Sequence, residues 1–460
     1  MHSNPISVGA LLLLGTRALA QESSGSASCT ATLSTNYSAP SVAAGYTARL
    51  VANNLTSPRG IKFDTEGNLL VIEEGVGITA LNYDNDGNSS CALLTSKSTI
   101  IADESLNHGI ELSADGSTLY ASNSDKLYSW TYSPSQRQTT SNASTLVQGM
   151  EGTDHTSRTL LLSRSAPGMI LVNRGSFENI DVQARSLESG HSQVKAFNIS
   201  GVSSPLDFNG NGVLLGWGLR NDVGIAEHPG TGGIWSVENS ADQVIRSGED
   251  IHEDNPAEKL NFLGYLNGTE SPNQGQNFGY PDCFAAWVPD DLPGFEGETG
   301  EQFALNELNA TNNDEGCADR VAPRLVFQAH MAPLDIKFNS EGTQAWISFH
   351  GSWNRDDPTG YKLSVVDFAG GEPVESSNSM SAATDIVSNP DNSECPSSCF
   401  RPVGLAWDED GRLFMSSDST GEIYMISREE GMVAQLCWRR AEANLCRTHR
   451  RYGLDSRRDN

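Results

Sequence analysis

Basic, imidazole and amide side chains recur next to short apolar segments of this sequence. The stretch AWISFHGSWNRDDPTGYKL, residues 345–363, places His350, Trp353 and Arg355 directly after an apolar run. Comparable residues precede apolar runs elsewhere: Arg59, His108, His155, Arg158, Arg220, Asn221 and Arg401. Arginine makes paired hydrogen bonds to carboxylates and phosphates. If the fold gathers these residues, they predict a positively charged pocket for an anionic ligand.

Taken singly, each of these residues has an ordinary structural explanation. Arg158 could pair with a neighbouring carboxylate, and Trp353 could be a packing aromatic. The sequence also lacks a Walker loop, an H-E-x-x-H motif, a G-x-S-x-G elbow and a G-x-G-x-x-G that follows a strand and opens a helix. The functional prediction therefore depends on the elements that position the recurring residues.

One pattern occurs six times: an apolar alternating segment, a turn with Gly, and a second such segment. Alternation on both sides of a short turn is typical of a β-hairpin. The first two intervals between units are both 49 residues, which suits a four-stranded propeller blade. The units begin at Gly60, Gly109, Arg158, Gly224, Asp335 and Gly404. We therefore predict an all-β fold, a six-bladed β-propeller.

Closure of such a ring would pair the early strand TARLVANNL, residues 47–55, with the late strand GEIYMIS, residues 421–427. Equivalent positions of a propeller repeat lie at equivalent radial places, so the polar residues should converge on one end of the central channel. The long interval from Gly224 to Asp335 predicts long loops on one face. A β-sandwich or a ring of seven or eight blades is the alternative.

Composition limits the partners. The chain has 460 residues, 37% of them hydrophobic, and a net charge of −28. Nucleic acids and anionic membranes attract basic surfaces, so neither is an expected partner. We expect a monomer with no membrane span.

The N-terminal sequence predicts secretion. Residues 1–20 combine a short apolar run with an Ala-Leu-Ala cleavage site, which is typical of a signal peptide. Seven glycosylation sequons agree with an extracellular protein: Asn36, Asn54, Asn88, Asn142, Asn198, Asn267 and Asn309. Residues 21–427 are then the propeller domain, and residues 428–460 an Arg-rich C-terminal tail.

Eight cysteines without zinc-type spacing favour disulfides. Cys395 and Cys399 can close a tight loop. Cys283 with Cys317, and Cys29 with Cys91, are further candidate pairs.

Four stretches resemble the glucose/sorbosone dehydrogenases, six-bladed quinoproteins that use pyrroloquinoline quinone (PQQ). They are GLRNDVGIAEHPGTGGIWSVEN, DHTSRTLLLS, FHGSWNRDDPTGYK and RPVGLAWDEDGRLF. With secretion, sequons and LNHGIELSADG, the chain is most similar to fungal PQQ-dependent pyranose dehydrogenases of auxiliary activity family 12. The resemblance covers roughly residues 38–427.

The resemblance implies oxidation of the anomeric hydroxyl of a monosaccharide, with hydride transfer to PQQ. His155 is then the general base and, with Arg220, a catalytic residue. An imidazole suits this role because its pKa lies near working pH. The implied cofactor-binding residues are Arg59, His108, Arg158, Arg220, Asn221, His350, Trp353, Arg355 and Arg401.

The resemblance also implies a calcium ion that bridges PQQ and protein. Calcium takes oxygen ligands, including backbone carbonyls, and VENSADQ is the matching stretch. Ser240 and Ala241 are therefore the expected ligands, although bacterial members have Gly-Pro there. The sequence has no cytochrome domain, so we expect electrons to pass to a separate acceptor, a cytochrome.

Two other functions remain open at this point. One is a calcium-dependent lactonase or esterase on the same scaffold, whose channel would carry Asp, Asn and Glu ligands instead of Arg and His. The other is a propeller that binds sugar or protein without a cofactor.

Overall fold

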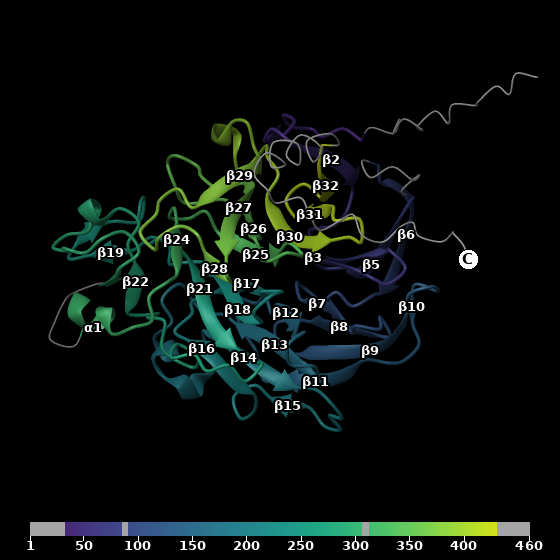
Figure 1. The fold of residues 1–460 in the computed structure, drawn as a ribbon, viewed down its shortest axis with the longest axis horizontal. Helices are drawn as coiled ribbons and strands as arrows, with labels where there is room; N and C mark the ends of the chain where they lie inside the picture. The colour runs from purple at the N-terminus through teal and green to yellow at the C-terminus, as the bar shows by residue number, and fades with distance from the viewer. Residues whose placement is uncertain (1–32, 85–90, 306–311, 430–460) are drawn as a thin grey trace, which may run out of the picture.

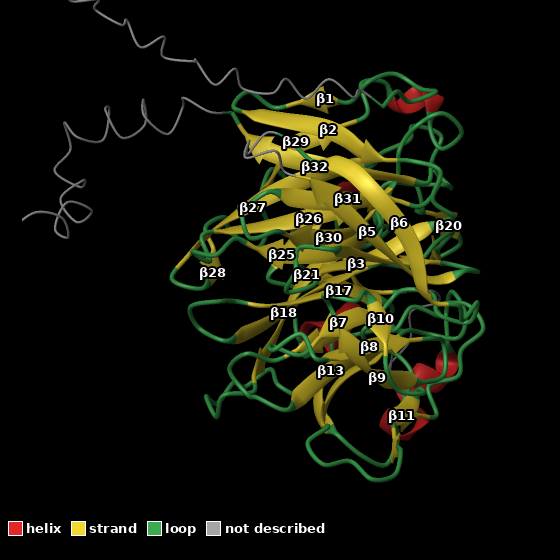
Figure 2. Cartoon of the chain, turned by 90° about the vertical axis from the view of Figure 1, so that its right-hand side faces the viewer, coloured by secondary structure: helices red, strands yellow, loops and turns green. Residues whose placement is uncertain are grey.

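The computed structural model describes residues 33–84, 91–305 and 312–429. The predicted signal peptide and almost all of the predicted tail lie outside the described residues. Within them the chain consists mainly of strands, with a few short helices in the loops (Figure 2).

Three four-stranded antiparallel blades come from the first half of the chain. Blade 1 contains β3 (Pro58–Phe63), β4 (Leu69–Glu73), β5 (Gly77–Asp84) and β6 (Leu93–Ile101). Blade 2 contains β7 (Ile110–Leu112), β8 (Thr118–Ser122), β9 (Leu127–Ser133) and β11 (Ser144–Gln148). Blade 3 contains β12 (Leu160–Leu162), β13 (Met169–Arg174), β14 (Gln193–Asn198) and β16 (Val213–Trp217).

Three more blades complete the ring (Figure 1). Blade 4 contains β17 (Asp222–Glu227), β18 (Gly233–Glu238), β21 (Glu258–Tyr265) and β24 (Leu325–Phe327). Blade 5 contains β25 (Pro333–Phe338), β26 (Gln344–Phe349), β27 (Lys362–Ala369) and β29 (Ala383–Ser388). Blade 6 contains β30 (Pro402–Trp407), β31 (Leu413–Ser417), β32 (Glu422–Arg428) and β2 (Tyr46–Ala52).

The remaining elements are short. Some extend the edges of blades: β1 (Ser41–Val42), β10 (Gln138–Thr139), β15 (Leu206–Asp207) and β28 (Glu372–Pro373). Others belong to loops: η1 (Val182–Arg185), η2 (Leu187–Ser189), β19 (Ile245–Arg246), β20 (Glu249–Asp250), β22 (Cys283–Ala285), η3 (Pro289–Asp291), β23 (Gln302–Ala304), α1 (Asp314–Ala318) and η4 (Asn392–Glu394). Most of the loop elements fall between Gly224 and Asp335, where long loops were predicted.

The ring closes as predicted. Strand β2 pairs with β32 in antiparallel register, with Leu50 opposite Tyr424. In Figure 1 the purple β2 lies beside the yellow β32. The prediction of a six-bladed propeller is confirmed, and all six predicted hairpins form the first two strands of a blade.

The core lies between neighbouring blades. On β4, Leu69 and Val71 pack toward blade 6, whereas Leu70 and Ile72 pack toward blade 2. Successive side chains of a strand point to opposite faces, and here both faces are covered. The continuous run LLVI is therefore buried on both sides.

Glycine allows the inner strands to approach one another closely. A Cβ added at Gly404 would lie 2.4 Å from the carbonyl oxygen of Arg59, and one added at Gly109 would lie 2.1 Å from that of Arg158. Serine hydroxyls then bind these carbonyls from the adjacent blade. Ser416 donates to Arg59 at 2.7 Å, and Ser122 donates to Arg158 at 2.6 Å. The starts of neighbouring inner strands are thereby held together.

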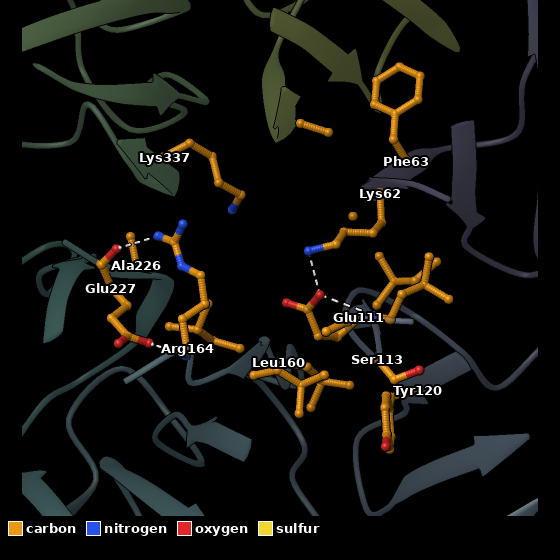
Figure 3. Close-up of a pocket in the computed structure, with 18 of the residues that line it drawn as sticks. Lys62, Phe63, Glu111, Ser113, Tyr120, Leu160, Arg164, Ala226, Glu227 and Lys337 are labelled. Carbon is orange, nitrogen blue, oxygen red and sulfur yellow. Dashed lines mark hydrogen bonds and ion pairs between the residues drawn. The ribbon is translucent and has the colours of Figure 1, made fainter. Parts of the chain in front are cut away.

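All six inner strands line a central cavity of about 930 Å³. Figure 3 shows its charged lining, including the ion pair between Lys62 and Glu111. Arg164 donates to the carbonyl of Glu227 at 3.1 Å, and Lys337 points into the same space. The channel is therefore polar in places, although much of its wall is aliphatic.

Two predicted disulfides, Cys283–Cys317 and Cys395–Cys399, are confirmed. Cys91 is also disulfide-bonded, and its predicted partner Cys29 lies outside the described residues. Among the described residues, no helix has the length and apolar character needed to cross a membrane.

The close approach at Gly404 predicts a stability effect. We expect Gly404→Ala to lower the free energy of unfolding by about 1–3 kcal/mol, because its methyl group would overlap the Arg59 carbonyl. Thermal unfolding would measure this loss. Gly210→Ala is the control, since its nearest neighbour would be 3.6 Å away. Equal melting temperatures for the two variants would contradict the account.

Candidate functional site

The functional side chains converge because of strand direction. In each antiparallel blade the start of the inner strand lies beside the end of the second strand. Arg59 and Arg401 therefore come from strand starts, whereas His350 and Asp418 follow the ends of β26 and β31. Residues far apart in sequence meet at one end of the channel.

The first cluster surrounds Asp418. Its carboxylate accepts a hydrogen bond from Arg59 Nη1 at 2.7 Å and lies 2.8 Å from His350 Nε2. Burial alone would raise the pKa of Asp418, but His350 and Arg59 outweigh it and hold that pKa well below its ordinary value. Burial lowers the pKa of His350, and Asp418 offsets only part of this effect. The arrangement is a neutral imidazole and a guanidinium on one carboxylate.

Arg401 completes this cluster. Its Nε donates to the carbonyl of His350 at 3.1 Å, and its Nη2 donates to that of Gly351 at 2.7 Å. It makes no ion pair with a carboxylate among the described residues. Its positive charge is therefore available to an incoming anion.

The second cluster contains His155, half-buried in the loop before β12. Its Nδ1 lies 2.8 Å from Ser176 Oγ. Burial lowers the pKa of His155 to about 3, and the positive charge of Arg220 adds to the shift. This pKa is below the near-neutral value expected from the sequence: the imidazole is neutral, as a proton acceptor must be, but it is a weaker base than an ordinary histidine.

Arg220 is buried beside this histidine. It donates to Asn179 Oδ1 at 2.8 Å and forms an ion pair with Asp242 at 3.2 Å. Asp242 also lies 3.5 Å from His330 Nδ1. Arg220 is thus held by the loops after β13 and β18, with its charge partly balanced by Asp242.

The two clusters are connected. Arg59 Nη2 donates to Ser157 Oγ at 3.4 Å, in the loop that carries His155. Several buried polar atoms in this region have no hydrogen-bond partner within the described part of the chain: Asn107 Oδ1, His108 Nδ1, Asn221 Oδ1, Ser240 Oγ and Asn354 Oδ1. Buried polar groups are normally satisfied, so this end of the channel suits a polar ligand.

Other predicted site residues have different surroundings. Arg158 is 0% exposed and donates to the backbone carbonyls of Met150, His155 and Ser157. Its guanidinium holds the loop that carries His155 and faces backbone instead of open space. His108 lines the channel, and burial, followed by Arg59, lowers its pKa.

The two other predicted site residues that follow β26, Trp353 and Arg355, differ in their surroundings. Arg355 is engaged by the carboxylate of Asp254 at 3.1 Å and by Glu253. Trp353 is 62% exposed, so its indole is largely uncovered. The structure brings His350 into the first cluster, whereas Arg355 is paired with Glu253 and Asp254 and Trp353 is exposed.

The predicted metal ligands lie beside Arg220. Its Nη1 donates to the carbonyl of Ser240 at 2.5 Å, and Ala241 is buried in an apolar cluster. A carbonyl has two lone pairs, so one remains on Ser240. No group of three or more His, Cys, Asp or Glu side chains within the described ranges could hold a metal ion.

Sequence reasoning missed several members of the site: Asp418, Asp242, Ser176, Asn179 and His330. Asp418 and Asp242 follow the ends of second strands, as His350 does. Applying the same position rule to β31 and β18 would have found them. Ser176 follows the end of β13 and could have been found in the same way.

The fold and site define a six-bladed propeller with a polar, Arg- and His-containing site at one end of its channel. The TrAA12-like family model matches residues 40–429, and the chain belongs to this family. The resemblance inferred from the sequence motifs is confirmed.

Two curated relatives are similar over most of the chain. The "pyrroloquinoline quinone-dependent sugar dehydrogenase" of Hypocrea jecorina is 46% identical over 419 residues, covering 87% of this chain and 94% of the relative. The "pyrroloquinoline quinone-dependent pyranose dehydrogenase" of Coprinopsis cinerea is 39% identical over 417 residues. That match covers 86% of this chain but only 55% of the relative.

Solved structures of other proteins are also similar to this chain. The calcium structure of a Trichoderma reesei AA12 enzyme is 47% identical with a TM-score of 0.84, covering 87% of this chain and 100% of that one. The holo form of the Coprinopsis cinerea pyranose dehydrogenase PQQ domain is 37% identical with a TM-score of 0.80, covering 87% and 99%. An aldose sugar dehydrogenase from Streptomyces coelicolor, 16% identical with a TM-score of 0.54, shares the fold.

The environment of His155 predicts its titration. In cofactor-free protein we expect this imidazole to stay neutral from pH 8 to pH 5, because burial and Arg220 lower its pKa to about 3. Imidazole ¹⁵N chemical shifts would follow it, with His155→Ala identifying its signals. A midpoint near 6.5, the ordinary histidine value, would contradict this environment.

Proposed function

We propose that this protein is a PQQ-dependent sugar dehydrogenase that oxidises the anomeric hydroxyl of a pyranose, with His155 as general base. The observation that carries the proposal is the pair of clusters at one end of the channel. Arg59, His350 and Arg401 form one, and His155 with Arg220 forms the other. Bound PQQ would supply the acceptor for the hydride that leaves the sugar carbon.

The residues present fit this cofactor. PQQ is a planar tricarboxylate, and Arg401 has no carboxylate partner within the described residues. Arg59 and His350 already share Asp418, so they are oriented before a ligand arrives. The unpartnered Oδ1 of Asn221 lies in the second cluster, beside Gly175 and His155, and can accept a hydrogen bond from a bound ligand there.

The chain's own residues would then perform the proton transfer. The neutral imidazole of His155 removes the hydroxyl proton of the sugar through Nε2, since Nδ1 contacts Ser176. Arg220 beside it stabilises negative charge that develops during this step. Both residues are held by hydrogen bonds to loops, which preserves their geometry.

A calcium ion fits the oxygen groups next to Arg220. The Ser240 carbonyl, Ser240 Oγ and the carboxylate of Asp242 are donors of the kind calcium takes. Bound there, the ion would supply a positive charge close to the site. The calcium structure of a similar Trichoderma reesei enzyme supports calcium as the ion.

Secretion and the electron acceptor belong to the proposal as well. All five sequon asparagines within the described residues are exposed: Asn36, Asn54, Asn142, Asn198 and Asn267. This exposure supports glycosylation in an extracellular protein. We propose that a separate redox protein, a cytochrome, accepts the electrons.

The first test concerns cofactor binding. We expect Arg401→Ala to weaken PQQ binding about ten- to a hundredfold, because a carboxylate would lose a charged hydrogen bond. Isothermal titration of cofactor-free protein in calcium would measure this. Arg324→Ala is the control, since that arginine also binds backbone carbonyls but lies before the outer strand β24. Unchanged affinity in Arg401→Ala would refute its placement.

The second test concerns the base. With PQQ and calcium saturating, we expect His155→Ala to lose roughly two to four orders of magnitude in kcat, the usual contribution of a positioned general base. Sugar KM should change little, because proton removal develops only toward the transition state. Dye reduction with a panel of aldoses and ketoses would measure both constants. If His155→Ala keeps most of its rate while His108→Ala is inactive, the base has been assigned to the wrong histidine.

A further inference from the structure

We propose that Ser176 is a positioning residue that fixes the tautomer of His155, so that Nδ1 carries the proton and Nε2 keeps its lone pair. The inference deepens the proposed function, because it matters for turnover only if His155 is the base. The tautomer itself is a property of the chain and can be measured without cofactor or substrate.

Two oxygen atoms of Ser176 face the same ring nitrogen. His155 Nδ1 lies 2.8 Å from the hydroxyl oxygen of Ser176 and 3.3 Å from its carbonyl oxygen. The hydroxyl in turn donates to the carbonyl of Glu178 at 2.9 Å. Ser176 thus connects the imidazole ring to a backbone acceptor.

These contacts determine where the imidazole proton lies. A carbonyl oxygen can only accept, so the Ser176 carbonyl requires a donor at Nδ1. A serine hydroxyl has one proton, and the Glu178 carbonyl takes it. The hydroxyl oxygen therefore also acts as an acceptor toward His155. Both contacts favour Nδ1–H, and a neutral imidazole then has its lone pair on Nε2.

Ser176 is itself held rigidly. It is buried, and its backbone N–H donates to the carbonyl of Arg220 at 2.9 Å. The preceding residue is Gly175, where an added Cβ would lie 2.6 Å from the Cβ of His155 and 2.8 Å from Asn221 Oδ1. The segment therefore packs closely against three predicted site residues, and the hydroxyl has little freedom to reorient.

A hydroxyl orients the base without adding charge. The charged groups that act on His155 are Arg220, Asp242 and Arg158, and none has a hydrogen bond to its ring among the described residues. A carboxylate in place of Ser176 would favour the imidazolium form and raise the pKa of His155. With serine at position 176, the imidazole of His155 is held in one orientation and also stays unprotonated at mildly acidic pH.

The tautomer can be measured in cofactor-free protein by long-range ¹H–¹⁵N imidazole spectra. We expect His155 to show a protonated Nδ1 and an unprotonated Nε2. Ser176→Ala removes the hydroxyl contact at 2.8 Å but keeps the longer carbonyl contact at 3.3 Å, so we expect a smaller fraction of the Nδ1–H tautomer than in the wild type. Ser176→Asp should restore the Nδ1–H form and move the titration of His155 to higher pH. A wild-type spectrum with protonated Nε2 would overturn the proposal, and this result needs no variant to fold.

Kinetics provide the second readout. We expect Ser176→Ala to lower kcat roughly ten- to a hundredfold, part of the full value of a general base, with KM nearly unchanged. Ser192→Ala is the matched control. Ser192 is also buried and bonded to the Gly175 carbonyl through its backbone, but its hydroxyl has no partner among the described residues. Equal kcat values for Ser176→Ala and Ser192→Ala would contradict the positioning role.

The experiments distinguish a wrong base from a wrong positioning role. If the spectra show the expected tautomer but His155→Ala retains full turnover, the proposed base is wrong and the role of Ser176 in orienting the ring stands. If His155→Ala is inactive but the tautomer does not depend on Ser176, the base stands and the positioning role is overturned.

Discussion

The site depends on how closely the inner strands of neighbouring blades approach one another at one end of the ring. Glycines such as Gly404 leave room for the facing carbonyls, and hydroxyls such as that of Ser416 bind those carbonyls from the next blade. The Arg59 carbonyl is one of the atoms held in this way. Because the backbone of Arg59 is fixed, its guanidinium can meet Asp418 of blade 6, which also contacts His350 of blade 5. The geometry of the site is therefore a consequence of ring closure.

Electrostatics at this end are balanced before any ligand binds. The carboxylate of Asp418 contacts Arg59 and His350, and that of Asp242 forms an ion pair with Arg220. An unpaired buried charge would be costly, so partners of this kind allow cations to remain close together. Arg401 differs because backbone carbonyls hold it. The guanidinium of Arg401 is therefore held in one orientation while its positive charge has no carboxylate partner among the described residues, which suits recognition of an anion.

The sequence predicted the ring and the convergence of several polar residues at one end of it. Hairpins marked by alternation and glycine located all six blades, and residues such as Arg401 preceding an inner strand could be assigned to one end. Asp418 and Asp242 were missed because only basic, imidazole and amide residues were compared between blades, although both carboxylates follow the end of a second strand, as His350 does. The repeat pattern in the sequence also could not predict the direction in which each side chain points. Arg158 occupies the expected position, yet its guanidinium faces backbone carbonyls, and Arg355 faces Asp254.

A crystal structure of the protein with PQQ and calcium would test the central claim most directly. The account predicts that the cofactor lies between the cluster of Arg59, His350 and Arg401 and the pair formed by His155 and Arg220. One of its carboxylates should contact Arg401, and Nε2 of His155 should face the space left for the sugar. Electron density for PQQ elsewhere, for example beside Lys62 and Lys337 in the channel, would contradict the account.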